Sequence, residues 1–215
     1  MSSGYQANYN VRTDGTLWSW GYNTAGELGQ NNRTKYSSPV QIPGTTWAGV
    51  YAGFASVFAI KTDGTLYSWG NNQHGQLGIN LGEDSGHRSS PVQIPGTTWT
   101  RVAGGFLTNY AIKTDGTLWS WGSGHYGKLG NNTGSPTGKR SSPVQIPGTT
   151  WNYVKAGYYG GMATRTDGTL WIWGGNDRGQ VADNTAVQRS SPVQVGSGTD
   201  WDVSAMGKLG GGGSP

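Results

Sequence analysis

TDGTLWSWG, at Thr13–Gly21, recurs three more times in this chain of 215 residues, as TDGTLYSWG, TDGTLWSWG and TDGTLWIWG. An Asp-Gly pair between two strand-like runs is a strong hairpin signal, because a type I′ turn needs positive φ at both central residues. Each copy therefore predicts two antiparallel strands joined by a tight turn. The turn aspartates recur at intervals of 49, 52 and 52 residues, so the repeat is about fifty residues long: Asp14, Asp63, Asp115 and Asp167.

A second motif keeps step with the first. SSPVQIPGTTW stands at Ser37–Trp47, returns letter for letter at Ser89–Trp99 and Ser141–Trp151, and is altered to SSPVQVGSGTDW at Ser190–Trp201. The PVQI run predicts a short strand at a sheet edge, because its leading Pro has no amide donor. Pro-Gly marks a turn, and the run that begins at each Trp supplies a further strand. Four strands per repeat are typical of one β-propeller blade.

The phase of the repeats predicts how the blades are assembled. The chain begins just after the point where a Trp-containing strand is due, and WDVSAMG at Trp201–Gly207 supplies such a strand near its other end. We expect one all-β propeller domain over residues 1–207, with the first blade completed by the C-terminal strand, which removes an open sheet edge. The expected blades span 1–42 plus 201–207, 47–94, 99–146 and 151–195.

These motifs carry a family resemblance. W-x-x-V-x-A-G, D-G-T-L-W-S-W-G, G-x-L-G and S-P-V together resemble the repeat of the regulator of chromosome condensation family, over Ser3–Gly207. The family implies a propeller that usually has seven blades, whereas four units stand here, and the fourth has GQVA at Gly179–Ala182 in place of GQLG. Three arrangements follow: a closed four-bladed monomer, a symmetric homodimer with eight blades, or a piece of a longer array.

Composition limits the class of protein. The chain has 39 Gly, 11 Trp and 11 Tyr but only 12% charged residues, which suits short strands joined by tight turns rather than a disordered chain. It has no Cys, which excludes disulfides and thiolate metal sites. No apolar run is long enough to span a membrane and no secretion signal is visible, so we expect cytoplasmic expression or virion association. KLGGGGSP at 208–215 resembles a flexible linker.

Eight tryptophans recur at two fixed repeat positions. Repetition at one phase indicates packing between blades, where each ring buries about 150–250 Å². The four turn aspartates are likewise explained by hairpin chemistry rather than by catalysis. The predicted structural tryptophans are Trp20, Trp69, Trp121 and Trp173 at one position, and Trp47, Trp99, Trp151 and Trp201 at the other.

Almost all variation falls in one loop of each repeat, between the SWG and SSP motifs. Its four copies are 15, 18, 18 and 15 residues long, at Tyr22–Tyr36, Asn71–Arg88, Ser123–Arg140 and Gly175–Arg189. Repeat proteins often bind through the face that carries such loops. The candidate binding residues are Tyr22, Glu27, Tyr36, His74, Glu83, Asp84, His87, His125, Tyr126, Lys139 and Arg178.

The sequence predicts a non-enzymatic binding or structural module. No catalytic set, metal-ligand spacing or cofactor motif can be nominated, and the nearly identical repeats resemble those of bacterial or phage surface and virion proteins. A protein partner is the first expectation. A glycan-binding propeller, which would use Tyr22, Tyr126, Tyr158 and Tyr159, and an engineered or excised array without a natural ligand stay open. A chromatin or nucleic-acid module using a basic belt is a further alternative, and the belt would comprise Arg12, Lys61, Lys113, Arg165, Arg88, Arg140 and Arg189.

Overall fold

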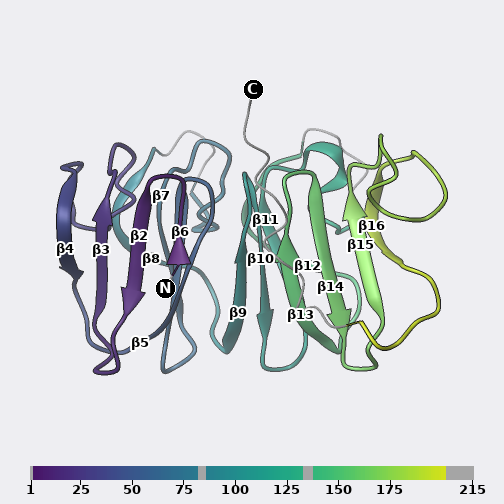
Figure 1. Cartoon of the computed structure of the whole chain (residues 1–215), viewed down its shortest axis with the longest axis horizontal. Coiled ribbons are helices and arrows are strands. Elements are labelled where there is room, and N and C mark those ends of the chain that lie inside the picture. The colour runs from purple at the N-terminus through teal and green to yellow at the C-terminus, as the bar shows by residue number, and fades with distance from the viewer. Residues whose placement is uncertain (1, 82–85, 133–137, 202–215) are drawn as a thin grey trace.

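The computed structural model describes residues 2–81, 86–132 and 138–201, and this part of the chain is all-β. It contains four sheets of four antiparallel strands each, which confirms the predicted propeller-type blades (Figure 1). The only helical element among the described residues is a 3₁₀ turn, η1 (His125–Gly127). None of the described helices is long and apolar enough to cross a membrane.

Each sheet is built from four strands in chain order, and we call the sheets blades 1 to 4. Blade 1 contains β1 (Ser2–Ser3), β2 (Ala7–Val11), β3 (Leu17–Gly21) and β4 (Tyr36–Ile42). Blade 2 contains β5 (Trp47–Ala52), β6 (Ser56–Lys61), β7 (Leu66–Gly70) and β8 (Arg88–Gln93). Blade 3 contains β9 (Trp99–Gly104), β10 (Thr108–Lys113), β11 (Leu118–Gly122) and β12 (Arg140–Ile146). Blade 4 contains β13 (Trp151–Ala156), β14 (Gly160–Arg165), β15 (Leu170–Gly174) and β16 (Arg189–Gln194).

The Asp-Gly hairpins form, but with a different turn from the predicted one. In blade 1 only Gly15 of the turn has a positive φ, at 77°, and Gly15 N–H donates to the Arg12 carbonyl while Arg12 N–H donates to the Thr16 carbonyl. This is a three-residue loop ending in a left-handed glycine, not the two-residue type I′ turn. The reason is the aspartate, because Asp14 Oδ1 accepts from both the amide (3.0 Å) and the hydroxyl (2.6 Å) of Thr16.

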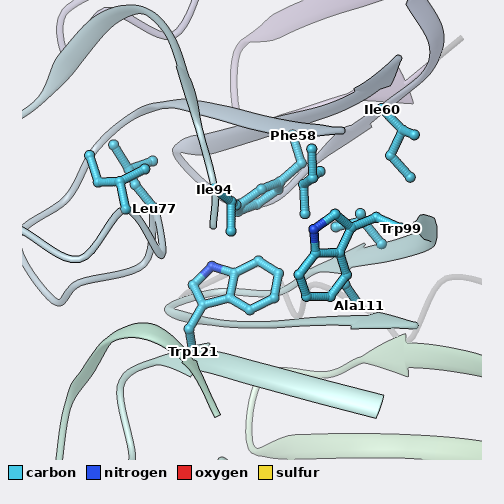
Figure 2. Close-up of a cluster of buried hydrophobic side chains, with 10 residues drawn as sticks. Phe58, Ile60, Leu77, Ile94, Trp99, Ala111 and Trp121 are labelled. Carbon is cyan, nitrogen blue, oxygen red and sulfur yellow. The ribbon is translucent and has the colours of Figure 1, made fainter. Parts of the chain in front are cut away.

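The hydrophobic cores lie between blades rather than inside them. Figure 2 shows one such cluster, in which Phe58 of blade 2 faces Trp99 and Trp121 of blade 3, and all three side chains are buried. Equivalent clusters lie between blades 1 and 2, around Trp47 and Trp69, and between blades 3 and 4, around Tyr110, Trp151 and Trp173. Each blade therefore buries its faces only against its neighbours.

One hydrogen bond recurs at every junction between blades. The indole N–H of Trp69 donates to the Glu27 carbonyl at 2.6 Å, that of Trp121 to the Gln76 carbonyl at 2.9 Å, and that of Trp173 to the Lys128 carbonyl at 2.9 Å. In each case the acceptor belongs to the variable loop of the preceding blade. Trp20, at the same repeat position in blade 1, is only partly covered, and no hydrogen bond from its indole occurs within the described residues.

A glycine lets the loop come close to the indole. A Cβ placed on Gly130, whose φ is +63°, would lie 2.7 Å from Nε1 of Trp173. Real carbon and nitrogen atoms in contact stay well beyond that separation, so a side chain at this position forces the indole away. The G-x-L-G motif is thus the part of each variable loop that the next blade covers.

Buried asparagines shape three of the four variable loops. Asn23 Oδ1 accepts from Leu28 N–H at 2.8 Å, and Asn72 and Asn176 do the same for Leu77 and Val181. The Nδ2 atom of Asn176 also donates to the carbonyls of Thr185 and Val187, which fixes the far end of the blade 4 loop. Blade 3 has Gly124 at this position, and there the chain forms η1 instead.

Blades 1 and 4 lie at opposite ends of the described part of the chain (Figure 1). The strand beside β2 in blade 1 is the two-residue β1, which pairs Ser2 with Tyr9. The predicted closing strand at 201–207 lies outside the described residues except for Trp201, which belongs to no strand and is 40% exposed. Closure of blade 1 by this strand therefore stays a prediction, and the linker at 208–215 also lies outside the described residues.

The recurrent indole hydrogen bond gives a prediction for stability. Trp121→Phe removes the donor at the junction of blades 2 and 3 and part of a fully buried ring, so we expect the free energy of unfolding to fall by about 1–3 kcal/mol. Trp119→Phe is the matched control, because the Trp119 indole bonds only within its own blade, to Thr117, and is partly exposed. Urea unfolding followed by circular dichroism measures both, and equal losses contradict the role of the junction.

The blade 4 loop gives a prediction for pH dependence. Hydrogen bonds from Thr185 and Arg189 lower the pKa of Asp183 to about 2, and the carboxylate lies 2.5 Å from Arg189 Nε. A lowered folded-state pKa means that the ionised group stabilises the fold above the ordinary value of 3.8 and that this contribution is lost as pH falls towards about 2. We expect the melting temperatures of the wild type and Asp183→Asn to differ at pH 6 and to converge near pH 2. A constant difference over this range contradicts the assignment.

Candidate functional site

Each blade presents one aromatic ring at the turn between its first two strands. The position follows a glycine in all four repeats and holds Tyr5, Phe54, Phe106 and Tyr158. Tyr159 follows directly in blade 4, and Tyr126 reaches the same place from the loop of blade 3. We call this set the aromatic ridge, and it comprises Tyr5, Phe54, Phe106, Tyr158, Tyr159 and Tyr126.

The rings of the ridge form a continuous row across all four blades. The centroids of Tyr5 and Phe54 are 4.7 Å apart, and those of Phe54 and Phe106 are 4.8 Å apart. Phe106 stacks on Tyr158 at 4.6 Å, and Tyr158 meets Tyr159 at 4.8 Å. Tyr126 closes the row edge-on to Tyr159 at 6.1 Å. Such aromatic pairs stabilise one another by about 0.5–1.5 kcal/mol each, so the row holds its own shape.

Backbone hydrogen bonds between neighbouring blades hold the turns that carry the rings. Tyr5 N–H donates to the Phe54 carbonyl at 3.2 Å, and Phe54 N–H donates to the Gly105 carbonyl at 3.1 Å. The ridge is therefore a direct product of blade packing: wherever two blades meet, their turns meet too, and one ring is placed beside the next.

The rings of the ridge are large and apolar, yet all of them are exposed except Phe106, which is partly covered. The exposed fractions are 65% for Tyr5, 42% for Phe54 and 50% for Tyr158. Tyr159 and Tyr126 are 45% and 53% exposed. A contiguous apolar surface of this kind marks an interaction site, and aromatic rings dominate the binding energy of protein interfaces.

The variable loops begin beside the ridge. Tyr22 N–H donates to the Gln6 carbonyl, and Asn71 N–H donates to the Ala55 carbonyl, each carbonyl being one residue beyond a ridge ring. Ser123 and Gly175 make the same contact with Leu107 and Tyr159. The predicted binding loops and the aromatic ridge therefore share one end of the blades.

Three residues predicted to bind lie at or near the ridge. Tyr22 lines a small pocket together with Tyr5 and Phe54, and the Lys35 ammonium lies 4.8 Å from the centre of the Tyr22 ring. Tyr126 lines a groove of about 380 Å³ with Tyr159 and several polar residues, among them Asp177 and Gln188. His125 lies next to Tyr126, with ring centroids 6.4 Å apart.

Other predicted residues make hydrogen bonds within the variable loops. Glu27 is 8% exposed, and its carboxylate accepts from Ala25 N–H at 2.8 Å while its carbonyl accepts from Trp69. Tyr36 accepts from Asn32, and the backbone of His74 donates to Gln76 Oε1. These contacts shape the loops.

The structure describes three of the five remaining candidates, His87, Arg178 and Lys139. Burial lowers the pKa of His87, as does nearby Arg33. Arg178 is exposed, and its Nε atom lies 3.9 Å from a carboxylate oxygen of Asp177. The Lys139 carbonyl accepts a hydrogen bond from the Arg140 guanidinium. Glu83 and Asp84 lie outside the described residues. Within the described ranges no three His, Asp or Glu residues are grouped so as to hold a metal ion.

The cations that precede the hairpin turns lie at the other end of the blades, against aromatic rings. The Lys113 ammonium is 4.7 Å from the ring centres of both Trp99 and Trp119. The Arg165 guanidinium lies 4.6 Å from Trp151 and 4.1 Å from Trp171. Each cation is thus held in a cation–π contact, a contribution of about 0.5–2 kcal/mol, and none of them lies at the ridge.

Sequence reasoning missed Tyr5, Phe54 and Phe106 as one set. Their shared signal is the repeat position: an aromatic residue directly follows a glycine in all four units, although it is Tyr twice and Phe twice. The position is not marked by one invariant residue. It is marked by an aromatic side chain at the same place in every repeat.

Curated relatives of this chain are eukaryotic proteins. Human E3 ubiquitin-protein ligase HERC2 is 26% identical over 190 residues, which is 86% of this chain and 4% of HERC2. Human protein RCC2 is 33% identical over 57% of this chain and 24% of RCC2. Ultraviolet-B receptor UVR8 of Arabidopsis thaliana is 27% identical over 91% of this chain and 33% of UVR8. The chain thus spans a third or less of each, and these relatives give no support to the expected bacterial or phage type.

Solved structures share the fold. Human WBSCR16 superposes with a TM-score of 0.76 at 23% identity, over 90% of this chain and 51% of that one. Yeast RCC1 (Prp20), solved bound to Kap60, superposes with a TM-score of 0.77 at 20% identity, over 94% of this chain and 48% of that one. The described blades therefore match about half of a longer propeller chain.

The sequence model of the regulator of chromosome condensation (RCC1) repeat matches residues 14–60, 63–106 and 115–164. A second model of the same repeat matches 47–76 and 152–180, so it extends the match into blade 4. The matched segments fall on the same hairpins, junction loops and glycine-aromatic turns that build the blades. The chain belongs to the regulator of chromosome condensation repeat family.

Proposed function

We propose that this chain is a non-enzymatic protein-binding propeller that contacts its partner through the aromatic ridge. The single observation that carries the proposal is the unbroken row of rings, one from every blade and two more at the blade 4 end, of which all but Phe106 are exposed. The variable loops flank the row, so they supply polar contacts around an apolar centre. This is the usual anatomy of a protein interface.

Ring spacing favours a protein over a nucleic acid base. Carbon atoms in contact lie about 3.5–4.0 Å apart, so a base inserted between two rings needs them about 7 Å apart. The centroids of the first four rings of the ridge are 4.6–4.8 Å apart, so no base fits between two of them. Apolar side chains of a partner can still pack across the exposed edges.

Solved relatives point to the same class of partner. The yeast propeller was solved bound to Kap60, and a second structure of it is linked to binding of Gsp1p and histones. Those partners belong to the yeast protein, but they are proteins in each case. A chromatin protein, such as a histone, is accordingly one of the partners to be tested here.

The experiment selects binding partners on the wild type and then compares their affinity for the wild type with that for variants that lack a ridge ring. Peptides displayed on phage are selected on the wild type and then measured by fluorescence anisotropy, with purified core histones as a second probe. Phe54→Ala and Tyr158→Ala should each weaken binding about tenfold or more, the loss of an interface hot spot. Thr45→Ala is the control, because Thr45 is exposed on the link between β4 and β5, outside both the ridge and the variable loops.

Two outcomes decide against the proposal. Peptides or histones that bind the ridge variants as tightly as the wild type place the contact surface elsewhere. Binding confined to a glycan array, lost in Tyr126→Ala but kept in Phe54→Ala, assigns the groove beside Tyr126 to a sugar instead. Thermal unfolding of each variant shows whether the blades remain folded.

A further inference from the structure

The groove at the blade 4 end of the aromatic ridge is built by two blades. Tyr126 comes from the variable loop of blade 3, and Tyr159 comes from the turn between β13 and β14. The rest of its lining comes from the variable loop of blade 4 and includes Gly175, Asp177 and Gln188. We call it the tyrosine groove.

Three departures from the repeat meet at this groove. Gly124 stands where the other three loops have a buried asparagine, and the chain there forms η1, which contains Tyr126. Tyr159 stands where the other three turns have a residue that is not aromatic. Gly175 opens a loop whose other copies begin with a residue that has a side chain. The tyrosine groove is therefore particular to the junction of blades 3 and 4.

The ring of Tyr126 depends on an unusual backbone conformation. Its φ of +61° lies in the left-handed region, which a residue with a bulky side chain rarely adopts. The equivalent residues of the other loops, Ala25, His74 and Arg178, are not in this region. Backbone strain of this kind is concentrated at binding and catalytic sites. In this chain it accompanies the placement of the Tyr126 ring 6.1 Å from that of Tyr159.

Gly175 keeps the space between the two tyrosines open. A Cβ placed on it would lie 3.5 Å from Cβ of Tyr126 and 3.4 Å from Cβ of Tyr159, so a side chain there would start between them. Gly175 is buried, and its N–H donates to the Tyr159 carbonyl at 2.9 Å. Its φ is not in the left-handed region, so the backbone does not require glycine. What the groove depends on is the missing side chain.

The lining of the groove suits a compact cation. The two tyrosine rings are inclined to one another by 71°, so they cannot hold a flat group between parallel faces. An aromatic ring does attract a cation that lies within about 6 Å of its centre. Asp177 is the one charged residue among the described residues that line the groove, and its charge is negative.

The Asp177 carboxylate is accessible to such a cation. Its Oδ1 atom accepts from Gln180 Nε2 at 2.8 Å, and its Oδ2 atom lies 3.9 Å from Arg178 Nε. The side chains of Asp177 and Arg178 are 71% and 86% exposed. An ion pair this open to water contributes little, so a cation from a partner can take the place of Arg178.

We propose that the tyrosine groove binds the ammonium group of a lysine side chain, free or methylated, on the protein partner. Because Tyr126 and Tyr159 belong to the ridge, the assignment rests on the proposed function. The apolar stem of a lysine packs against the tyrosine rings while its charged end reaches Asp177. The groove then sets the register of the partner along an otherwise uniform row of rings.

Nuclear magnetic resonance of the ¹⁵N-labelled protein tests the groove directly. The probes are the Nα-acetyl amides of lysine, of trimethyllysine and of norleucine, whose chain is similar but neutral. We expect one or both lysine probes to shift the backbone amide signals of Gly175 and Asp177 saturably, and the norleucine probe to bind about tenfold more weakly. The tighter of the two lysine probes identifies the free or the methylated form.

Three variants test the role of each part of the groove. Asp177→Asn removes the charge and should weaken binding of the lysine probe about three- to fivefold. Gly175→Ser introduces the residue type that opens the blade 3 loop and should abolish binding, because it occupies the space between the rings. Arg178→Ala removes the competing cation and should tighten binding about twofold. Asp200→Asn is the matched control, because Asp200 is an exposed acid that does not line the groove.

Two sets of results separate this site from the proposed function. Absence of saturable shifts, equal binding of the lysine and norleucine probes, or shifts caused by N-acetylglucosamine but not by lysine overturn the lysine site. The proposed function still stands in those cases if selected peptides depend on Phe54. Lysine-specific shifts that weaken in Asp177→Asn support the site even where Phe54→Ala binds those peptides as tightly as the wild type.

Discussion

The structure depends on the junction between blades, where an indole of one blade donates to a loop carbonyl of the blade before it. Trp69, Trp121 and Trp173 repeat this contact with similar geometry, and the hydrophobic clusters of the protein are arranged around it. The loop carbonyl satisfies an indole N–H whose burial without an acceptor would cost about 1–3 kcal/mol. The variable loops are therefore fixed where they touch the next blade and free to vary elsewhere.

This division explains why the two ends of the blades differ. At one end, the hairpin aspartates accept hydrogen bonds from threonines two residues later, which lowers the pKa of each carboxyl, and the preceding cations lie over tryptophan rings. At the other end, the turns between the first two strands bring one ring from each blade into a row. One end stabilises the repeat and the other presents an apolar surface.

The sequence could predict the blades because their signals are local. Asp-Gly turns, the leading proline of the PVQI strand and the fixed phase of tryptophan are visible in single segments. It could not predict the ridge, because Phe54 becomes a neighbour of Phe106 only when two blades pack, fifty residues apart. It also could not predict that the Glu27 carboxylate accepts from the Ala25 amide, because a charged residue in a variable loop gives no sign of such a contact. The predicted type I′ turn was wrong for a related reason. Thr16 donates two hydrogen bonds to the Asp14 carboxylate, and the preferences of the Asp-Gly pair alone do not include that contact.

The short links between blades have a consequence for folding. β4 ends at Ile42 and β5 begins at Trp47, and the later links are equally brief, from Gln93 to Trp99 and from Ile146 to Trp151. Because the faces are so alike, their chemistry alone does not distinguish the correct neighbour from the blade after it. Tether length makes that distinction, since a few residues reach only the adjacent unit. Lengthening one of these connections is thus expected to scramble the order of assembly while leaving every individual contact as favourable as before.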